Sequence, residues 1–260
     1  AGALTATVTD QYGNPVADGV TVSFTASLGN LVPATATTVG GVATATLSST
    51  VSGVATVTAT IGSLSATIPV TFIPGAPFTL TLTAVPDTLS VDASSTLTAT
   101  ATDQYGNPVA DGTTISFTTS LGALSSGTAN TSGGDAVVTL TSMTPGVATV
   151  TATAGSLSAT ILVTFTPGAP FTVTLTAVPD TVLVGNASAL TATVTDQYGN
   201  PVADGVTVSF TASLGNLVPA TATTAGGVAT ATLSSTVSGV AMVTATVGSL
   251  SATIPVTFIP

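Results

Sequence analysis

The chain has 260 residues with no Lys, Arg, His or Cys, and its ten acidic residues, all Asp, give a formal net charge of −10. Without His or Cys there is no imidazole base, no thiol nucleophile, no disulfide and no zinc site of the usual kind. Without Lys or Arg there is no phosphate clamp, so we expect no nucleic-acid partner. This composition excludes most enzyme classes, and we predict that the chain is not an enzyme.

The mean hydropathy of +0.70 raises the question of a membrane segment. A spanning helix needs about 20 consecutive apolar residues, and no run in this sequence approaches that length. We therefore predict no membrane span in this segment. Because the sequence shows no initial Met, signal peptide or anchor motif, we interpret it as a mature fragment of something longer.

Internal repetition is the dominant feature of the sequence. The string DQYGNPVADG begins at Asp10, Asp103 and Asp196, and the string PGAPFT begins at Pro74 and Pro167. Units of this size are typical of single domains, so we predict three domains of one fold. Their boundaries are 1–74, 75–167 and 168–260.

The first unit lacks the counterpart of residues 75–93, which contains the expected first strand. In the middle unit the apolar side of that strand is expected to consist of Phe78, Leu80, Leu82 and Ala84. Because burying each large apolar side chain contributes about 1.5–3 kcal/mol, we expect that residues 1–74 do not fold in isolation. Two sources are open for the missing strand: the chain continued upstream, or a neighbouring chain that donates a strand.

Apolar residues alternate with Thr along most segments, and this period of two predicts half-buried strands. The DQYGNPVADG string supplies the Gly, Asn-Pro and Asp-Gly residues that a chain reversal needs. About seven short strands per unit, with no helical period, predict an all-β fold of tandem immunoglobulin-like β-sandwiches in an elongated array. The alternation assigns five middle-unit residues to one core: Phe117, Leu140, Val150, Ile161 and Phe165.

The strings DQYGNPVADG, VTVSF, GGVATATL and GVATVTAT follow one another in this order. In this order they resemble the group 1 bacterial Ig-like domain of invasin- and intimin-type adhesins. The resemblance extends over all three units, apart from the missing first strand. It implies rigid stalk modules that hold a binding tip away from the cell surface, and it implies no catalytic or cofactor-binding residues.

The Asp residues are the main ionisable candidates for a site. Stacked head to tail, one end of each unit is expected to face the DQYGNPVADG loop of the next, so hard oxygen ligands for calcium would meet there. The alternative is that these side chains cap turns through local backbone hydrogen bonds, and no D-x-D-x-D-G loop is present. We therefore predict no metal and no other cofactor, with seven junction candidates for calcium as the alternative: Asp87, Asp92, Asp103, Asp111, Asp180, Asp196 and Asp204.

Each unit has one tyrosine in the same loop, at Tyr12, Tyr105 and Tyr198. We expect each ring to pack on the proline-containing linker at the domain junction, since one ring per unit makes no binding platform. The rows of Thr, such as TLTLT at 79–83, resemble an ice-binding face, but twisted sandwich strands do not form a flat lattice. Thr is in addition a common solvent-facing strand residue.

The sequence therefore predicts a structural, non-catalytic segment of an extracellular or cell-surface fibre. Its partners would be the neighbouring repeats of the same chain, and the two prolines of the PGAP linker would restrict bending between them. Two alternatives remain. In one, identical chains pack laterally or donate strands to form a filament or sheath. In the other, the chain is a glycan- or ice-binding adhesin module, although it lacks a convergent polar pocket.

Overall fold

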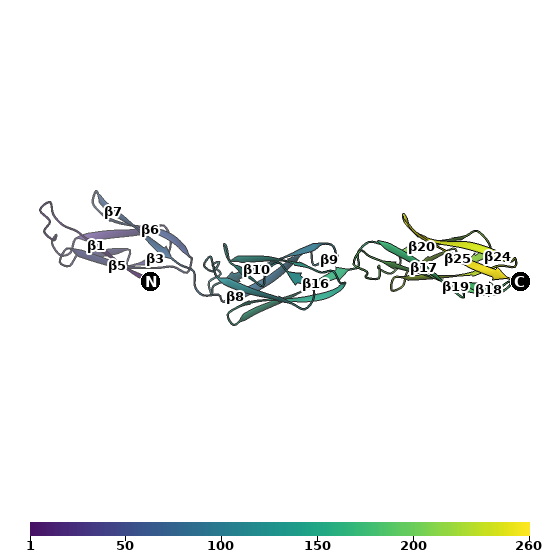
Figure 1. Ribbon diagram of the computed structural model, residues 1–260. Helices are drawn as coiled ribbons and strands as arrows, with labels where there is room; N and C mark the ends of the chain where they lie inside the picture. Colours follow the sequence, from purple (N-terminus) through teal and green to yellow (C-terminus); the bar gives the residue numbers. More distant parts are fainter.

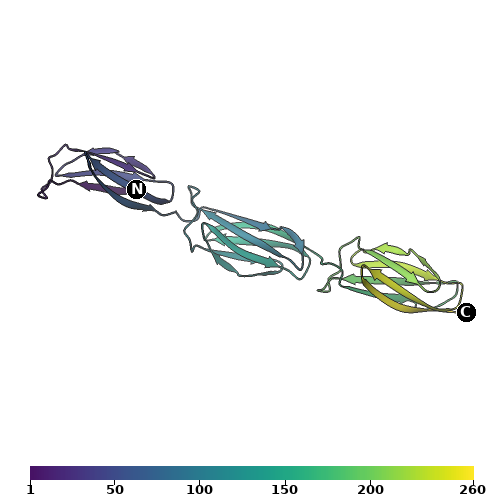
Figure 2. The same ribbon diagram turned by 90° about the horizontal axis from the view of Figure 1, so that it is seen from above.

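The computed structural model describes all residues, 1–260, and its regular secondary structure consists entirely of β-strands. Figures 1 and 2 show three two-layered sandwiches that follow one another in a line, in chain order, joined by short linkers. We call them repeats 1, 2 and 3. The predicted array of tandem immunoglobulin-like sandwiches is confirmed. The structure contains no helix with the length and apolar character that crossing a membrane requires.

Repeats 2 and 3 are complete sandwiches of the same topology. One sheet of repeat 2 has the order β8-β10-β14-β12 and the other β9-β16-β15-β11-β13, and repeat 3 repeats this with β17-β19-β23-β21 and β18-β25-β24-β20-β22. The strands of repeat 2 are β8 (Thr79–Val85), β9 (Thr88–Ser90), β10 (Ser94–Thr102), β11 (Thr114–Thr119), β12 (Ala123–Leu124), β13 (Thr128–Asn130), β14 (Asp135–Thr141), β15 (Gly146–Ala154) and β16 (Leu157–Thr166). Those of repeat 3 are β17 (Thr172–Val178), β18 (Thr181–Leu183), β19 (Ala187–Thr195), β20 (Thr207–Ala212), β21 (Asn216–Val218), β22 (Thr221–Thr223), β23 (Val228–Ser234), β24 (Gly239–Val247) and β25 (Leu250–Ile259).

Repeat 1 has the same arrangement without the first two strands. Its sheets have the orders β1-β5-β3 and β7-β6-β2-β4. Its strands are β1 (Gly2–Thr7), β2 (Thr21–Ala26), β3 (Asn30–Val32), β4 (Thr35–Thr37), β5 (Val42–Ser48), β6 (Gly53–Ile61) and β7 (Leu64–Phe72). These seven strands have the same places as their counterparts in repeats 2 and 3, and the counterparts of β8 and β9 lie outside the given sequence.

Alternation decides which side chains are buried. Of the five residues assigned to the core of repeat 2, Phe117, Leu140, Val150 and Phe165 are buried in one cluster, and Ile161 packs against it half-buried. The prediction of a single core is therefore confirmed. Leu80, Leu82 and Ala84 also pack against this cluster.

Two details differ from the expectations. Each complete repeat has nine strands rather than about seven, because segments of only two or three residues, such as β9 and β12, are too short to show alternation. Phe78 was expected on the apolar side of the first strand, but it is 63% exposed. It precedes β8 and lines a hollow beside the linker, so it lies at the junction and not in the core.

Candidate functional site: the junctions between repeats

The turn that follows β10 begins at Asp103, whose side chain organises it. Asp103 Oδ1 accepts hydrogen bonds from the backbone N–H groups of Tyr105 and Asn107, each at 2.9 Å. The backbone N–H of Gly106 donates to the Asp103 carbonyl oxygen, and Gly106 has a φ of +83°, which glycine adopts without strain. The DQYG segment is therefore a turn built on an Asp side chain, as the turn chemistry of the sequence predicts.

The second carboxylate oxygen of Asp103 binds the linker between repeats 1 and 2. Asp103 Oδ2 accepts a 3.0 Å hydrogen bond from the backbone N–H of Gly75. A Cβ atom on Gly75 would lie 3.3 Å from Asp103 Cβ, closer than ordinary van der Waals contact, so a residue without a side chain suits this approach. Asp103 is only 3% exposed, so the linker covers its carboxylate.

Asn107 connects this turn to the body of repeat 1. Its Nδ2 donates to Asp103 Oδ2 at 2.9 Å and to the carbonyl oxygen of Thr50 at 2.8 Å. Its Oδ1 accepts a 3.1 Å hydrogen bond from the backbone N–H of Ser52. Thr50 and Ser52 lie in the loop between β5 and β6. One side chain therefore joins the two repeats, while Asp103 holds that side chain and the linker together.

The second junction, between repeats 2 and 3, repeats this arrangement with one bond fewer. Asp196 Oδ2 accepts from the N–H of Gly168 at 3.0 Å, and Asn200 Nδ2 donates to the carbonyl oxygen of Met143 at 2.8 Å. The position equivalent to Ser52 is Pro145. Proline has no backbone N–H, so Asn200 Oδ1 receives no bond from the preceding repeat.

In repeat 1 the equivalent turn forms around Asp10 from contacts within the turn itself. Asp10 Oδ1 accepts from the N–H groups of Tyr12 at 2.8 Å and Asn14 at 2.9 Å, and Asn14 Nδ2 donates to Asp10 Oδ2 at 3.1 Å. Asp10 is exposed, whereas Asp103 and Asp196 are buried. The turn is thus preorganised within its own repeat, and docking of the preceding repeat adds the linker and loop contacts.

The hydrogen bonds shift the acidity of these carboxyl groups. The side chain of Asn107, followed by the backbone N–H of Gly75, lowers the pKa of Asp103 from 3.8 to about 2, against a smaller opposing effect of burial. At Asp196 burial acts to raise the pKa, but the bonds from Asn200 and Gly168 together outweigh it, and the pKa is lowered. Asp103 is therefore ionised near neutral pH and serves there as an acceptor, not as a proton donor.

The other Asp candidates make local contacts. Asp111 and Asp204 accept 2.7 Å hydrogen bonds from the N–H groups of Gly133 and Gly226. The backbone carbonyl oxygens of Asp87 and Asp180 accept from strand N–H groups, both at 2.7 Å. Asp92 accepts from the hydroxyl group of Ser90.

Nowhere does the structure bring three or more His, Cys, Asp or Glu side chains together in a group that could hold a metal ion. Asp92 and Tyr198 do line one hollow at the second junction, so the ends of successive repeats face each other as expected. The groups that surround the junction carboxylates are hydrogen-bond donors, namely backbone and Asn N–H groups. This is what the turn-capping alternative predicts. Calcium binding at the junctions stays an alternative.

The tyrosine side chains differ in exposure, and two of the three line a hollow at a junction. Tyr12 in repeat 1 is 80% exposed, Tyr105 is 59% exposed and Tyr198 is 41% exposed. Tyr105 lines the hollow at the first junction together with Pro77 of the linker. Tyr198 lines the corresponding hollow with Val91 and Met143, and no linker proline borders it. Tyr105 therefore shares a hollow with a linker proline at the first junction, whereas Tyr198 shares one with residues of the preceding repeat at the second.

Asn107 and Asn200, which make the contacts between repeats, were not among the predicted site residues. An Asn stands four residues after the Asp in every copy of DQYGN, at positions 14, 107 and 200, and this spacing was the available signal.

Residues 1–73, 79–166 and 172–259 match the bacterial Ig-like domain (group 1) family. The chain belongs to this family.

Solved structures extend this assignment to arrays of domains. The crystal structure of invasin, described as a bacterial integrin-binding protein, matches with 27% identity and a TM-score of 0.65. The match covers 99% of this chain and 56% of the invasin chain, so this chain spans little more than half of that protein. No curated protein sequence matches the chain.

Two further structures share the fold at lower identity. The Escherichia coli adhesin FdeC matches with 22% identity and a TM-score of 0.57, covering 100% of this chain and 93% of that one. Yersinia pseudotuberculosis InvD matches with 21% identity and a TM-score of 0.59, covering 97% of this chain and 90% of that one. A row of domains similar in arrangement to this one therefore occurs in several proteins.

Proposed function

We propose that the chain is a rigid, non-catalytic spacer of a bacterial cell-surface adhesin, in which stacked repeats hold an adhesive part away from the cell. The observation that carries this proposal is the bonding of both junctions by the same Asp–Asn pair. At each of them an Asp carboxylate binds the linker N–H and an Asn side chain binds the preceding repeat. Linkers of six and five residues (73–78 and 167–171) without such contacts would leave adjacent domains free to reorient.

Family membership and the likeness to invasin support a setting on the cell surface. The integrin binding named for invasin is a property of that protein, and the proposal does not extend it to this chain. The absence of Lys and Arg also suits a surface protein, because it leaves no site for trypsin-like proteases. A spacer needs no catalytic group, and the buried Asp103 and Asp196 carboxylates are occupied by hydrogen bonds.

Adhesion of coated beads tests the proposal. Beads that carry only the purified chain should attach neither to cultured cells nor to a glycan array. When the chain is inserted between the bead and a domain of known ligand specificity, binding of that ligand should be retained. Attachment of beads that carry the chain alone would show that it is an adhesive module and would contradict a spacer role.

A further inference from the structure

The sulfur-containing side chains of the molecule are few and lie outside its cores. Cys and Met are the residues whose sulfur mild oxidants convert, and this chain has no Cys and two methionines, Met143 and Met242. Met143 is 69% exposed and Met242 is 46% exposed, and neither belongs to any of the three hydrophobic cores. Both thioethers are therefore accessible to an oxidant, while the packing of the cores contains no sulfur.

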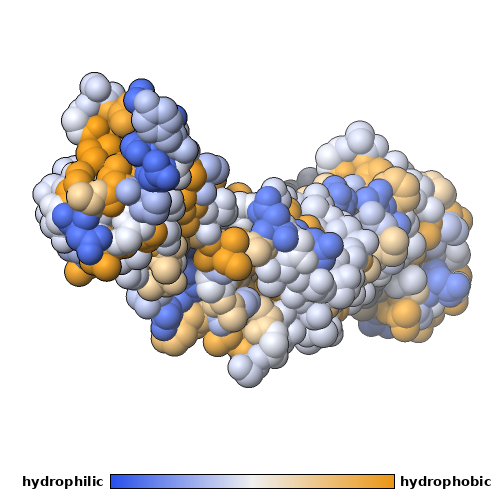
Figure 3. Space-filling model, turned by 90° about the vertical axis from the view of Figure 1, so that its left-hand side faces the viewer, coloured by the Kyte–Doolittle hydropathy of each residue, from blue (hydrophilic) through white to orange (hydrophobic).

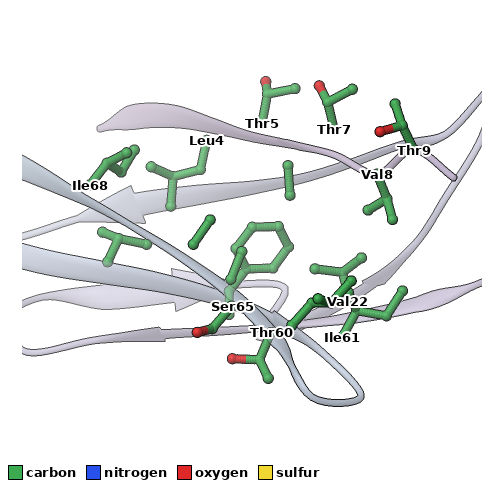
Figure 4. Close-up of a pocket in the computed structure, with 16 residues that line it drawn as sticks. Leu4, Thr5, Thr7, Val8, Thr9, Val22, Thr60, Ile61, Ser65 and Ile68 are labelled. Carbon is green, nitrogen blue, oxygen red and sulfur yellow. The ribbon is translucent and has the colours of Figure 1, made fainter. Parts of the chain in front are cut away.

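Repeat 1 contains no methionine at all. Viewed from the end at which this repeat lies, hydrophobic residues gather on its surface (Figure 3). A hollow between β1 and the β6–β7 hairpin is lined by apolar and hydroxyl side chains, among them Leu4, Val22 and Ile68, and the close-up shows no sulfur there (Figure 4). The apolar surface of repeat 1 is therefore inert toward an oxidant that attacks thioethers.

Met143 lies at the second junction, in the loop between β14 and β15. Its carbonyl oxygen accepts the 2.8 Å hydrogen bond from Asn200 Nδ2, which joins repeat 2 to repeat 3. Together with Val91 of repeat 2 and Tyr198 of repeat 3, Met143 also lines the hollow of ≈ 380 Å³ between the two repeats. One residue therefore supplies both the polar bond across this junction and part of its apolar wall.

The first junction has no sulfur at the equivalent position. Thr50 stands there, and its carbonyl oxygen accepts the same bond from Asn107. The first junction also has the bond from the N–H of Ser52, which Pro145 removes at the second. With one polar bond fewer, the second junction depends more on the apolar side chains around its hollow. A change in the polarity of Met143 therefore acts on the weaker of the two junctions.

We propose that Met143 is a reversible oxidation site, with hydrogen peroxide as the oxidant, and that its oxidation loosens the second junction. The sulfur forms a bond to one peroxide oxygen, the O–O bond breaks, and the products are the sulfoxide and water. The sulfur loses two electrons and the peroxide gains them. A reductase that supplies two thiols removes the oxygen again as water, and the two thiols become a disulfide.

The sulfoxide replaces an apolar side chain by a polar one that requires hydration. The oxidised side chain therefore turns from the hollow toward water, and the apolar wall beside Val91 and Tyr198 is lost. The loop itself stays in place, because Ser142 Oγ donates to the carbonyl oxygen of Thr144 at 2.7 Å and accepts from its N–H at 3.1 Å. The junction loosens without coming apart, and the population of reoriented domains rises about threefold, as loss of a thioether–aromatic contact implies.

Amide hydrogen exchange in the intact chain tests this proposal without any label. The N–H of Gly168 is bonded to Asp196 Oδ2 at the second junction, and the N–H of Gly75 is bonded to Asp103 Oδ2 at the first, both at 3.0 Å. After treatment with hydrogen peroxide, exchange at Gly168 should be about threefold faster, since it follows the open population. Exchange at Gly75 should not change, and a methionine sulfoxide reductase should restore the original rate at Gly168.

Two variants provide matched controls, because the other repeats carry Thr at both methionine positions. Met143→Thr introduces the residue found at positions 50 and 236, and Met242→Thr the residue found at positions 56 and 149. Both chains should fold as the parent does. The response of Gly168 to peroxide should disappear in Met143→Thr and persist in Met242→Thr.

Peptide mass spectrometry on the same samples locates the added oxygen atoms. The proposal is overturned if Met143 stays unmodified while Met242 is oxidised, or if the Met143 sulfoxide forms and exchange at Gly168 does not change. An equal acceleration at Gly75, or a response that persists in Met143→Thr, would overturn it as well. The proposal rests on the spacer role, in which the stiffness of a junction matters. Its test does not involve adhesion, so it can fail while the bead experiment gives the result expected of a spacer.

Discussion

The side-chain amide of Asn107 donates a 2.8 Å hydrogen bond to the carbonyl oxygen of Thr50, which lies in the preceding repeat. Asn107 is fixed in turn by Asp103, which also accepts from the linker at Gly75. The same Asp–Asn turn is formed around Asp10 in repeat 1 from local contacts alone. Docking of two repeats therefore adds bonds to a prepared surface and requires little further ordering.

Replacing Asn107 by Ala should loosen the first junction without unfolding either repeat. The substitution removes the bonds to Thr50 and Ser52, and each neutral hydrogen bond contributes about 0.5–1.5 kcal/mol. The population of reoriented domains should rise by about tenfold. Asn14→Ala is the matched control, because Asn14 occupies the same turn in repeat 1 and takes no part in the first junction.

Pulsed electron paramagnetic resonance measures this directly. The chain has no Cys, so cysteines introduced at exposed, equivalent positions give unique spin labels. Ser65 in repeat 1 and Ser158 in repeat 2 suit the first junction. The distance distribution should be narrow in the parent chain, broad in Asn107→Ala and unchanged in Asn14→Ala. Equal widths in all three chains would show that Asn107 does not hold the junction.

Acidification should loosen the same junction between about pH 4 and pH 2. The folded pKa of Asp103, about 2, lies below its ordinary value of 3.8, so the carboxyl group binds its proton more weakly in the folded chain. Its stabilising contribution is complete above the ordinary pKa and is lost as the pH falls through the folded one. Carboxyl groups are the side chains that titrate in this window, and without His no side chain of ordinary pKa titrates between about pH 5 and 8.

The same spin-label pair, measured along a pH series, checks this expectation. Broadening should begin below pH 4 and be reversible on neutralisation. A distribution that broadens at pH 6, or that stays unchanged at about pH 1, would mean that the Asp103 carboxylate does not control the junction.

Pro145→Ser should stiffen the second junction. Serine restores the backbone N–H that Ser52 supplies at the first junction, so Asn200 Oδ1 gains a donor. Labels at Ser158 and Ser251, both exposed, should give a narrower distribution than in the parent chain. The reverse exchange, Ser52→Pro, should broaden the first junction. If neither exchange alters its junction, this N–H group has no mechanical role.

Calcium should have little effect on the chain, since no group of three acidic residues is brought together. The junction carboxylates already accept hydrogen bonds from N–H groups, which a cation would have to displace. Thermal unfolding with millimolar calcium and with a chelator should therefore coincide. A midpoint several degrees higher with calcium, and lost on Asp103→Asn, would favour the junction metal site instead.

Much of the fold could be predicted from the sequence because sandwich strands place apolar residues at alternate positions. Phe117, Leu140 and Phe165 could be assigned to one core on that basis alone. Phe78 could not, because alternation continues past the start of β8 into the linker and does not mark where the sheet ends. The short strand β9 is set by pairing with β16, a distant segment, and leaves no periodic pattern.

The candidate site was predicted in location but not in its key residue. The Asp residues of the DQYGN turn are visible as ionisable groups, and the turn chemistry follows from their neighbours. Asn107 was missed because its partners, the carbonyl oxygen of Thr50 and the N–H of Ser52, are backbone groups that any sequence provides. The effect of Pro145 could be recognised only from the structure, in which the equivalent residue Ser52 donates its N–H to Asn107 Oδ1.

Small-angle X-ray scattering of the intact chain tests the central claim, a rigid rod of three stacked repeats, most directly. Strands rise about 3.3 Å per residue, and the longest strands, such as β15 (Gly146–Ala154), run the length of a repeat. Each repeat with its loops should therefore advance roughly 35–40 Å. The account predicts a maximum dimension of roughly 105–120 Å and one extended conformation that fits the whole curve. A maximum dimension well below this range, or a curve that only a broad mixture of bent forms can fit, would contradict it.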